Sequence, residues 1–207
     1  TITMDFLLLL CVFTNSENNF ISESAIFFYD ENQSIKPSDV LRSRYVALEN
    51  APSTRIETLK TQFRCRGGNE YVKLIHDLLD NKIDSTNKFQ SLEYECYLFE
   101  DLQQMVDEIN KREKLDGLSR MVAGYAWEWI SNKEKSAFDI VIEDTKLRWN
   151  SVAIDWVNSP KSIEEVGCIH TTQGYDLNYT GVIIGPELDY DFEKKQLVEI
   201  INYFKYT

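Results

Sequence analysis

Residues 169–184 include the side chains of this chain that are best suited to binding a ligand. An apolar run leads into a polar corner, and a second apolar run, residues 180–184, follows it. Such a corner places hydroxyl groups, an amide and backbone N–H groups at the end of an expected strand. Open α/β sheets bind phosphates and nucleotides at that place. We therefore predict a binding corner between two buried strands, formed by Thr171, Thr172, Gln173 and Gly174.

A second set of polar residues follows the apolar run 25–29, which is typical of a buried strand. This strand would deliver Asp30 and Gln33 to its C-terminal end, although a polar turn is the ordinary interpretation of the spacing alone. His170, beside the polar corner, also has two possible interpretations, a catalytic one and a structural one. A lone histidine near a strand end more often satisfies a hydrogen bond than catalyses a reaction.

A third set closes the extended segment 55–63, where Arg64 and Arg66 precede Gly67 and Gly68. Arginine is suited to bidentate contact with phosphate, and glycines let the backbone approach a ligand. A surface arginine pair beside a turn explains the same spacing. Each of the three sets is a weak signal by itself.

The composition bounds the class of protein that positions these residues. The chain has 207 residues, enough for one large α/β domain or two small ones, and 43% of them are hydrophobic, which indicates a globular fold. The formal net charge of −12 is not that of an autonomous nucleic-acid binder, which is normally basic.

The cysteines and the first apolar run indicate a cytoplasmic protein without a metal site. Cys11, Cys65, Cys96 and Cys168 are scattered, with no Cys-x-x-Cys pair and no nearby histidine pair, so we expect buried reduced thiols and no zinc. The apolar run 6–13 is too short to span a bilayer and reads better as a core strand, so we expect no membrane partner.

Strand patterns alternate with helical patterns along the chain. This order predicts an α/β fold with a mainly parallel sheet covered by helices on both faces, which is the RecA-like three-layer arrangement. The expected strands are residues 6–13, 25–29, 55–63, 93–99, 119–127, 137–142, 166–169 and 180–184. The expected helices are residues 69–79, with Asn69 as the N-cap, 101–112 and 193–204.

Taken in order, the three polar sets resemble helicase motifs. Residues 30–33 (DENQ) look like motif III, Gln62-x-Arg64 looks like motif IV, and residues 170–176 (HTTQGYD) look like motif V of superfamily 1 helicases. The sequence of these segments resembles still more closely a bacterial family, the Schlafen group 3-like DNA/RNA helicase domain proteins. The resemblance covers about residues 25–206, through the phrases FFYDENQ, QFRCRGG, RMVAGYAWEW and EVGCIHTTQGYDLNYTGVIIGPEL.

The resemblance implies roles for individual residues. Gln33 would sense the γ-phosphate of ATP, Arg64 would contact phosphate across an interdomain cleft, and both would count as catalytic. Phosphoryl transfer needs mainly such positioning and charge neutralisation. The expected nucleotide-binding residues are Asp30, Gln33, Arg64, Gly174 and Asp176, and the residues expected to couple the nucleotide to DNA or RNA are His170, Thr171, Thr172 and Gln173.

The sequence also departs from the family pattern. No glycine is followed by lysine, so the chain has no P-loop, and the final residues lack the arginine of motif VI. We therefore expect residues 1–50 to be the end of a first RecA-like lobe and residues 51–207 to be a truncated second lobe. ATP and Mg²⁺ would bind through a P-loop-containing first lobe on the same or another chain, and this chain alone would not hydrolyse ATP.

Three alternatives stay open at this point. The chain could be a non-catalytic interaction module that keeps the RecA-like fold, which the acidic balance favours. A metal-dependent nuclease is a weaker hypothesis, based on Asp144-x-Lys146 after an expected strand. The tryptophans could stack on single-stranded nucleic acid, although packing in the core or against another lobe explains them better: Trp127, Trp129, Trp149 and Trp156.

Overall fold

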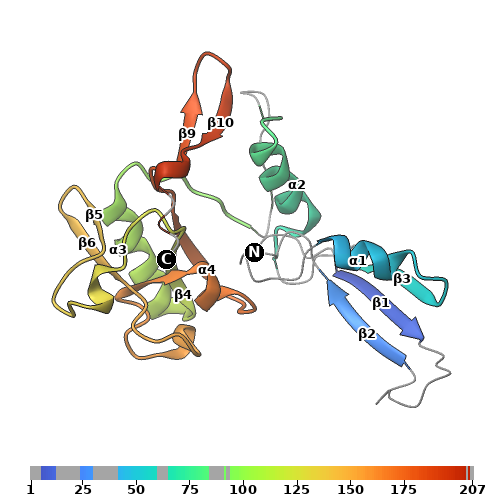
Figure 1. The fold of residues 1–207 in the computed structure, drawn as a ribbon. Helices are drawn as coiled ribbons and strands as arrows, with labels where there is room; N and C mark the ends of the chain where they lie inside the picture. The colour runs from blue at the N-terminus through green and yellow to red at the C-terminus, as the bar shows by residue number, and fades with distance from the viewer. Residues whose placement is uncertain are drawn as a thin grey trace. The chain divides into compact units, whose positions relative to one another are not determined.

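The structure is a computed structural model that describes residues 6–12, 24–29, 42–59, 65–83, 91, 94–203 and 205. Its contacts divide the chain into two compact units, Thr1–Glu95 and Cys96–Thr207, whose elements are labelled in Figure 1. The expected domain boundary at residue 50 falls inside the first unit, and the assignment of the two parts to motor lobes stays a prediction.

The first unit is built on a three-stranded antiparallel sheet in the order β2-β1-β3. The apolar run forms the central strand of this sheet, which agrees with the expectation of a strand. Two helices follow in the sequence. The elements are β1 (Phe6–Val12), β2 (Ser24–Tyr29), α1 (Arg42–Glu49), β3 (Thr54–Leu59) and α2 (Gly68–Leu79).

The start of α2 corrects one expectation. Gly67 is the N-cap and makes no side-chain cap hydrogen bond, whereas Asn69 lies within the first turn. The chain enters the helix through Gly68, whose φ of +58° favours glycine. The backbone conformation of the two glycines, and not an asparagine cap, therefore sets the helix start.

The second unit contains a five-stranded sheet in the order β5-β6-β7-β4-β8. Strands β6, β7, β4 and β8 are parallel, and only β5 runs antiparallel to its neighbour, which confirms the expected mainly parallel α/β sheet. Its elements are α3 (Leu102–Asp116), β4 (Ser119–Ala123), β5 (Ile140–Ile142), β6 (Thr145–Trp149), β7 (Glu165–Cys168), α4 (Ile169–Thr172) and β8 (Tyr179–Ile183).

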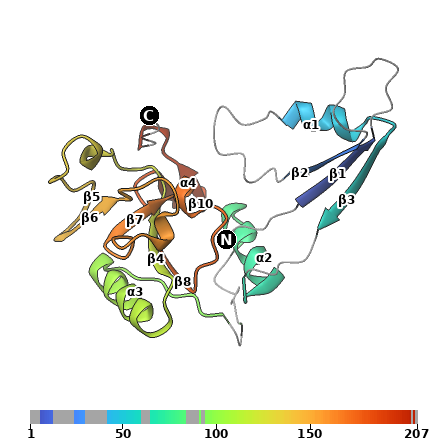
Figure 2. The same ribbon diagram turned by 90° about the horizontal axis from the view of Figure 1, so that it is seen from below.

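Helical segments cover both faces of this sheet. Ile109 of α3 packs so closely on β8 that a Cβ at Gly181 would lie 3.0 Å from it. Figure 2 shows α3 along one side of β4 and β8. Gly167 of β7 points to the opposite face, because side chains alternate along a strand. Trp156, in the short helix η3 (Trp156–Asn158), covers it there, and α4 adjoins η3. The arrangement is consistent with a RecA-like fold.

The core of the second unit lies between α3 and the sheet. Its largest member is Trp149, which is 1% exposed, and Ile140 and Val166 are fully buried beside it. The helix begins at Leu102 because Asp101 caps it, accepting a hydrogen bond from Gln104 N–H at 2.9 Å. The expected helix at residues 101–112 is thus confirmed and is one turn longer.

Two expected elements are wrong. Residues 94–99 form no strand, and two of the side chains that were expected in it, Tyr97 and Leu98, are 66% and 92% exposed. Residues 193–204 form no long helix; they contain β10 (Gln196–Glu199), which pairs with β9 (Leu188–Asp191), and the short helix η4 (Ile201–Tyr203). Lys195, at φ +54°, turns the chain back into β10.

Candidate functional site at the carboxyl edge of the sheet

The parallel strands bring four chain segments to one edge of the sheet. Because β4, β6, β7 and β8 run in the same direction, the residues that follow them meet at their shared carboxyl edge. The polar corner follows β7 there, as helix α4 and the residues after it. The sequence prediction of a strand, a polar corner and a second strand is therefore confirmed, with β7 ending at Cys168 and β8 beginning at Tyr179.

The threonine hydroxyls of the corner bond back to the end of β7. Thr171 Oγ1 donates to the Cys168 carbonyl at 2.9 Å, and Thr172 Oγ1 donates to the same carbonyl at 3.2 Å. Thr171 is only 6% exposed. Gln173 and Gly174, by contrast, are exposed, and Gly174 has a φ of +89° with open space where a Cβ would stand. The surface of the corner is therefore formed by an amide side chain and bare backbone.

Asn150, which follows β6, holds the end of β7 in place. Its Oδ1 accepts a hydrogen bond from Cys168 N–H at 3.2 Å, and its Nδ2 donates to the Val152 carbonyl at 3.0 Å. The side chain is 2% exposed. Sequence reasoning gave Asn150 no role. The available signal was an asparagine directly after an apolar strand.

A buried tryptophan–carboxylate pair supports the corner from below. Trp156 Nε1 donates to Glu165 Oε2 at 2.9 Å, and the same oxygen accepts from Ser151 N–H at 2.9 Å. A Cβ at Gly167 would collide with the Trp156 ring and would lie 2.9 Å from Thr172 Cγ2. Only glycine fits between the indole and α4, so this position sets the height of α4 above the sheet.

Aromatic rings line the edge beside the corner. The Tyr125 ring lies 5.8 Å from the His170 ring and 5.9 Å from the Trp149 ring, between centroids. Trp149 is 1% exposed and Trp156 is fully buried, so neither offers a face to a nucleobase. Trp127 and Trp129 are partly buried against the core. The expectation that the tryptophans pack is confirmed for the two buried residues.

One exposed hydrogen bond ties the corner to the loop that precedes η3. Tyr175 Oη donates to Asp155 Oδ1 at 2.7 Å, and Asn158 Nδ2 donates to the same oxygen at 2.7 Å. The bond from Tyr175, with that from Asn158, lowers the pKa of Asp155 against the opposing effect of burial. The same bond raises the pKa of Tyr175. Asp155 adopts a left-handed backbone at φ +53°.

Tyr175→Phe is expected to raise the pKa of Asp155 toward its ordinary value of 3.8, because the first cause of its depression is removed. A lowered folded pKa means that this bond contributes stability above pH 3.8 and that the contribution is lost as the pH falls through the folded pKa. Carboxylate NMR titration of the two proteins measures the shift. Tyr97→Phe is the matched control, since Tyr97 is 66% exposed. An Asp155 titration that is identical in all three proteins would contradict the expectation.

The comparisons with known proteins give the chain a family. The family model described as "Schlafen group 3, DNA/RNA helicase domain" matches residues 15–205. The chain belongs to this family. The Schlafen group 3 resemblance expected from the sequence is thereby confirmed, and the protein carries a helicase-related domain.

A curated relative of this Schlafen group 3 domain is "Uncharacterized protein YPL245W" of Saccharomyces cerevisiae, which is 28% identical over 119 residues. The match covers 56% of this chain and 24% of the relative, so the matched part is about a quarter of the relative's length. No solved structure matches the chain.

Of the three polar sets expected from the sequence, the set at residues 170–176 lies within the described part of the Schlafen group 3 domain, and the structure brings its residues together. His170, Thr171, Thr172, Gln173, Gly174 and Asp176 all lie on or just after α4. The other expected site residues, Asp30, Gln33 and Arg64, lie outside the described residues, so their expected roles stay predictions.

The candidate nuclease residue Asp144 of the Schlafen group 3 domain lies in a turn. Asp144 occupies the exposed turn between β5 and β6, where Glu143 has a φ of +51°, and no group of three His, Cys, Asp or Glu residues with metal-binding geometry occurs among the described residues. The nuclease hypothesis therefore gains no support. None of the described helices combines the length and the apolar character needed to cross a membrane.

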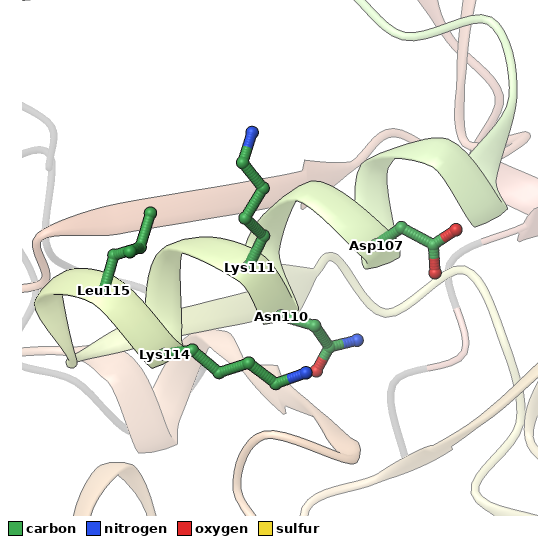
Figure 3. A pocket seen from close by; sticks show the side chains of 5 residues that line it. All are labelled: Asp107, Asn110, Lys111, Lys114 and Leu115. Atoms are coloured by element: carbon green, nitrogen blue, oxygen red, sulfur yellow. The ribbon is translucent and has the colours of Figure 1, made fainter.

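The hollow on α3 is also separate from the polar corner. Figure 3 shows its five lining side chains extending from successive turns of one helix, with Lys111 and Leu115 on one side and Asn110 and Lys114 on the other. They do not converge on a common point. None of the expected site residues lines this hollow.

Proposed function

We propose that this chain is the second motor lobe of a helicase-like, ATP-dependent DNA or RNA enzyme of superfamily 1. The observation that carries the proposal is the exposed Gln173–Gly174 corner at the carboxyl edge of a parallel sheet, in a chain of a DNA/RNA helicase domain family. Ligands of open α/β sheets bind at this edge. Gln173 and the adjacent backbone would contact the sugar–phosphate chain, and Asp176 would contact a ribose.

The threonines would act as positioning residues in this proposal. Their hydroxyls close the turn onto Cys168, which fixes the direction in which Gln173 leaves α4. Asn150 fixes the same strand end from β6. The corner is thus held by hydrogen bonds on two sides before any ligand arrives, and pre-organisation of this kind reduces the entropic cost of binding.

The described residues fit only part of the proposed ligand set. The bare backbone at Gly174 and the Gln173 amide suit a phosphodiester or a ribose. The described residues do not form an acidic cage for Mg²⁺. We therefore propose that ATP and Mg²⁺ are held mainly by a P-loop-containing lobe, on the same or another chain, with Asp30, Gln33 and Arg64 contributing from this one.

The test measures the binding of an oligonucleotide to the full chain. Fluorescence anisotropy is the readout, at two salt concentrations. Gln173→Ala is expected to weaken binding by about tenfold, because hydrogen bonds to charged groups contribute about 1.5–3 kcal/mol. Gln104→Ala, an exposed glutamine on α3, is the matched control and should bind as the unsubstituted chain does. Equal affinity of both variants would reject the proposed contact, and absence of binding by the unsubstituted chain would reject the proposed function.

The second candidate function is a non-catalytic interaction module. Two observations favour it: the net charge is −12, and the carboxylates Asp155 and Asp176 lie at or beside the corner. Such a module would bind neither oligonucleotide nor nucleotide. The anisotropy measurement above, repeated with a fluorescent ATP analogue, separates the two candidates.

A further inference from the structure

The hairpin β9–β10 carries an exposed aromatic tip that the proposed function does not use. Its two strands form a two-stranded sheet of their own, and Figure 1 shows them projecting from the five-stranded sheet. Phe192 is 82% exposed and Tyr190 is 40% exposed, and their rings meet edge to face with centroids 5.1 Å apart. An exposed pair of this size at the end of a projecting element gains little from burial within the chain.

The turn beside the rings is closed by contacts of Asp191 and carries two lysines. Asp191 Oδ1 accepts hydrogen bonds from the N–H groups of Glu193 and Lys194, both at 2.9 Å, and Asp191 Oδ2 pairs with Lys194 Nζ at 3.2 Å. Asp189 is likewise engaged, since its Oδ1 accepts from Tyr190 N–H at 2.7 Å. The tip therefore carries three carboxylates, those of Asp189, Asp191 and Glu193, beside its two lysines. Lys195 is exposed at the left-handed position of the same turn.

The hairpin starts from the carboxyl edge of the sheet. Its base is closed by the hydrogen bond from Ile200 N–H to the Glu187 carbonyl at 2.8 Å, a few residues after β8 ends. Four residues of strand then extend the tip by about 13 Å from that base. The tip and the Gln173–Gly174 corner therefore belong to the same edge, and a ligand chain several nucleotides long could meet both.

We propose that the tip formed by Tyr190, Phe192, Lys194 and Lys195 is a stacking site for an unpaired base of single-stranded nucleic acid. The inference rests on the proposed function, because it assumes that DNA or RNA lies along this edge. Exposed aromatic faces accept any base, and Lys195, exposed in the same turn, can contact a phosphate, whereas Lys194 is held by its ion pair with Asp191. Phe192 would supply the stacking face, and Tyr190 would hold that ring in place.

The first test measures the affinity of the full chain for fluorescein-labelled oligothymidine and oligouridine. Phe192→Ala should weaken binding by about tenfold, whereas Phe192→Trp should retain it. Lys195→Gln should lower the slope of log affinity against log salt by about 0.7, the value for one lost phosphate contact with a single strand. Tyr97→Ala removes another exposed aromatic ring, outside the hairpin, and should change nothing.

Photocrosslinking locates the contact independently of affinity. An oligonucleotide that contains 5-iodouracil should crosslink to the peptide that includes Phe192. If the unsubstituted chain binds but Phe192→Ala behaves as Tyr97→Ala does, or if the crosslinks fall elsewhere, the stacking site is refuted and the proposed function survives. If the unsubstituted chain does not bind, both are refuted. Circular dichroism of each variant confirms that the fold is retained.

Discussion

Trp156→Ala is expected to lower the free energy of unfolding of the second unit by about 3–5 kcal/mol, the usual cost of removing a large buried aromatic side chain. The residue is fully buried, and its ring fills the space above Gly167. The substitution also removes one of the two donors to Glu165 Oε2, so that a buried carboxylate keeps only the bond from Ser151 N–H. The cavity and the lost hydrogen bond both lower the free energy of unfolding.

Urea denaturation followed by tryptophan fluorescence measures this loss. All four tryptophans lie in the second unit, so the signal reports that unit, and three remain after the substitution. Trp156→Phe keeps most of the packing but loses the N–H donor, and its expected cost is about 1–2 kcal/mol. Tyr97→Ala, at an exposed position, should stay within about 0.5 kcal/mol of the unsubstituted chain. A loss below about 1 kcal/mol for Trp156→Ala would show that Trp156 does not hold this face of the sheet.

The same substitution is expected to loosen the corner. Gly167 and Thr172 both touch the Trp156 ring or lie beside it, and the Thr172 hydroxyl bonds to the end of β7. Amide exchange at residues 169–175 should therefore accelerate in Trp156→Ala under conditions where the chain is still folded. The packing of Trp156 under α4 therefore stabilises the surface that is proposed to bind nucleic acid.

The part of the fold that was predictable from the sequence is the part with a strong local pattern. The run from Glu165 to Ile183 has apolar strands on both sides of a glycine-containing corner, and the structure places β7, α4 and β8 there. Helix α3 was predictable for a similar reason, because its apolar residues recur at helical spacing, whereas the cap formed by Asp101 was found only in the structure. In both cases local propensity and burial agree.

The failures arise where tertiary pairing decides the outcome. Residues 193–204 have apolar residues at a helical spacing, but the turn made by Asp191 and the left-handed Lys195 pairs β10 with β9. Residues 94–99 alternate as a strand does, but they pair with none of the strands that the structure describes. A periodic pattern states which side chains could share a face, and it carries no information on whether a partner is present.

The support of the candidate site was unpredictable for a different reason. Asn150 and Glu165 look like ordinary polar residues in the sequence, and only the fold shows that both are buried and bonded to backbone N–H groups. Their partners are 18 and 14 residues away along the chain. The exposed corner residue Gln173 was predictable from the motif, whereas the residues that hold the corner required the structure.

Asp139→Ala is expected to lower the free energy of unfolding of the second unit by at least about 3 kcal/mol, because hydrogen bonds to charged groups contribute about 1.5–3 kcal/mol each. Asp139 is 6% exposed and accepts three bonds. Ser131 N–H donates to Oδ1 at 2.7 Å, while Ser131 Oγ at 2.6 Å and Trp149 N–H at 2.8 Å both donate to Oδ2. Alanine would leave these donors buried without an acceptor.

Two variants separate the role of this carboxylate from the general effect of losing an acidic side chain. Asp139→Asn keeps one carbonyl oxygen but turns an amide N–H₂ group toward hydrogen-bond donors. Its loss of unfolding free energy should therefore lie between zero and the loss for alanine. Asp144→Ala, in the exposed turn of the same β5–β6 hairpin, should be nearly neutral. Equal stability of Asp139→Ala and Asp144→Ala in urea would contradict the prediction.

The Asp139 prediction also extends to binding, because the bond to Trp149 N–H fixes the end of β6, and the next residue, Asn150, fixes the end of β7. If the Gln173–Gly174 corner binds nucleic acid, Asp139→Ala should lose oligonucleotide affinity at temperatures where its secondary structure is still present. Gln173→Ala should lose affinity without any loss of stability. A variant that is destabilised but binds as tightly as the unsubstituted chain would show that the contact to nucleic acid lies elsewhere.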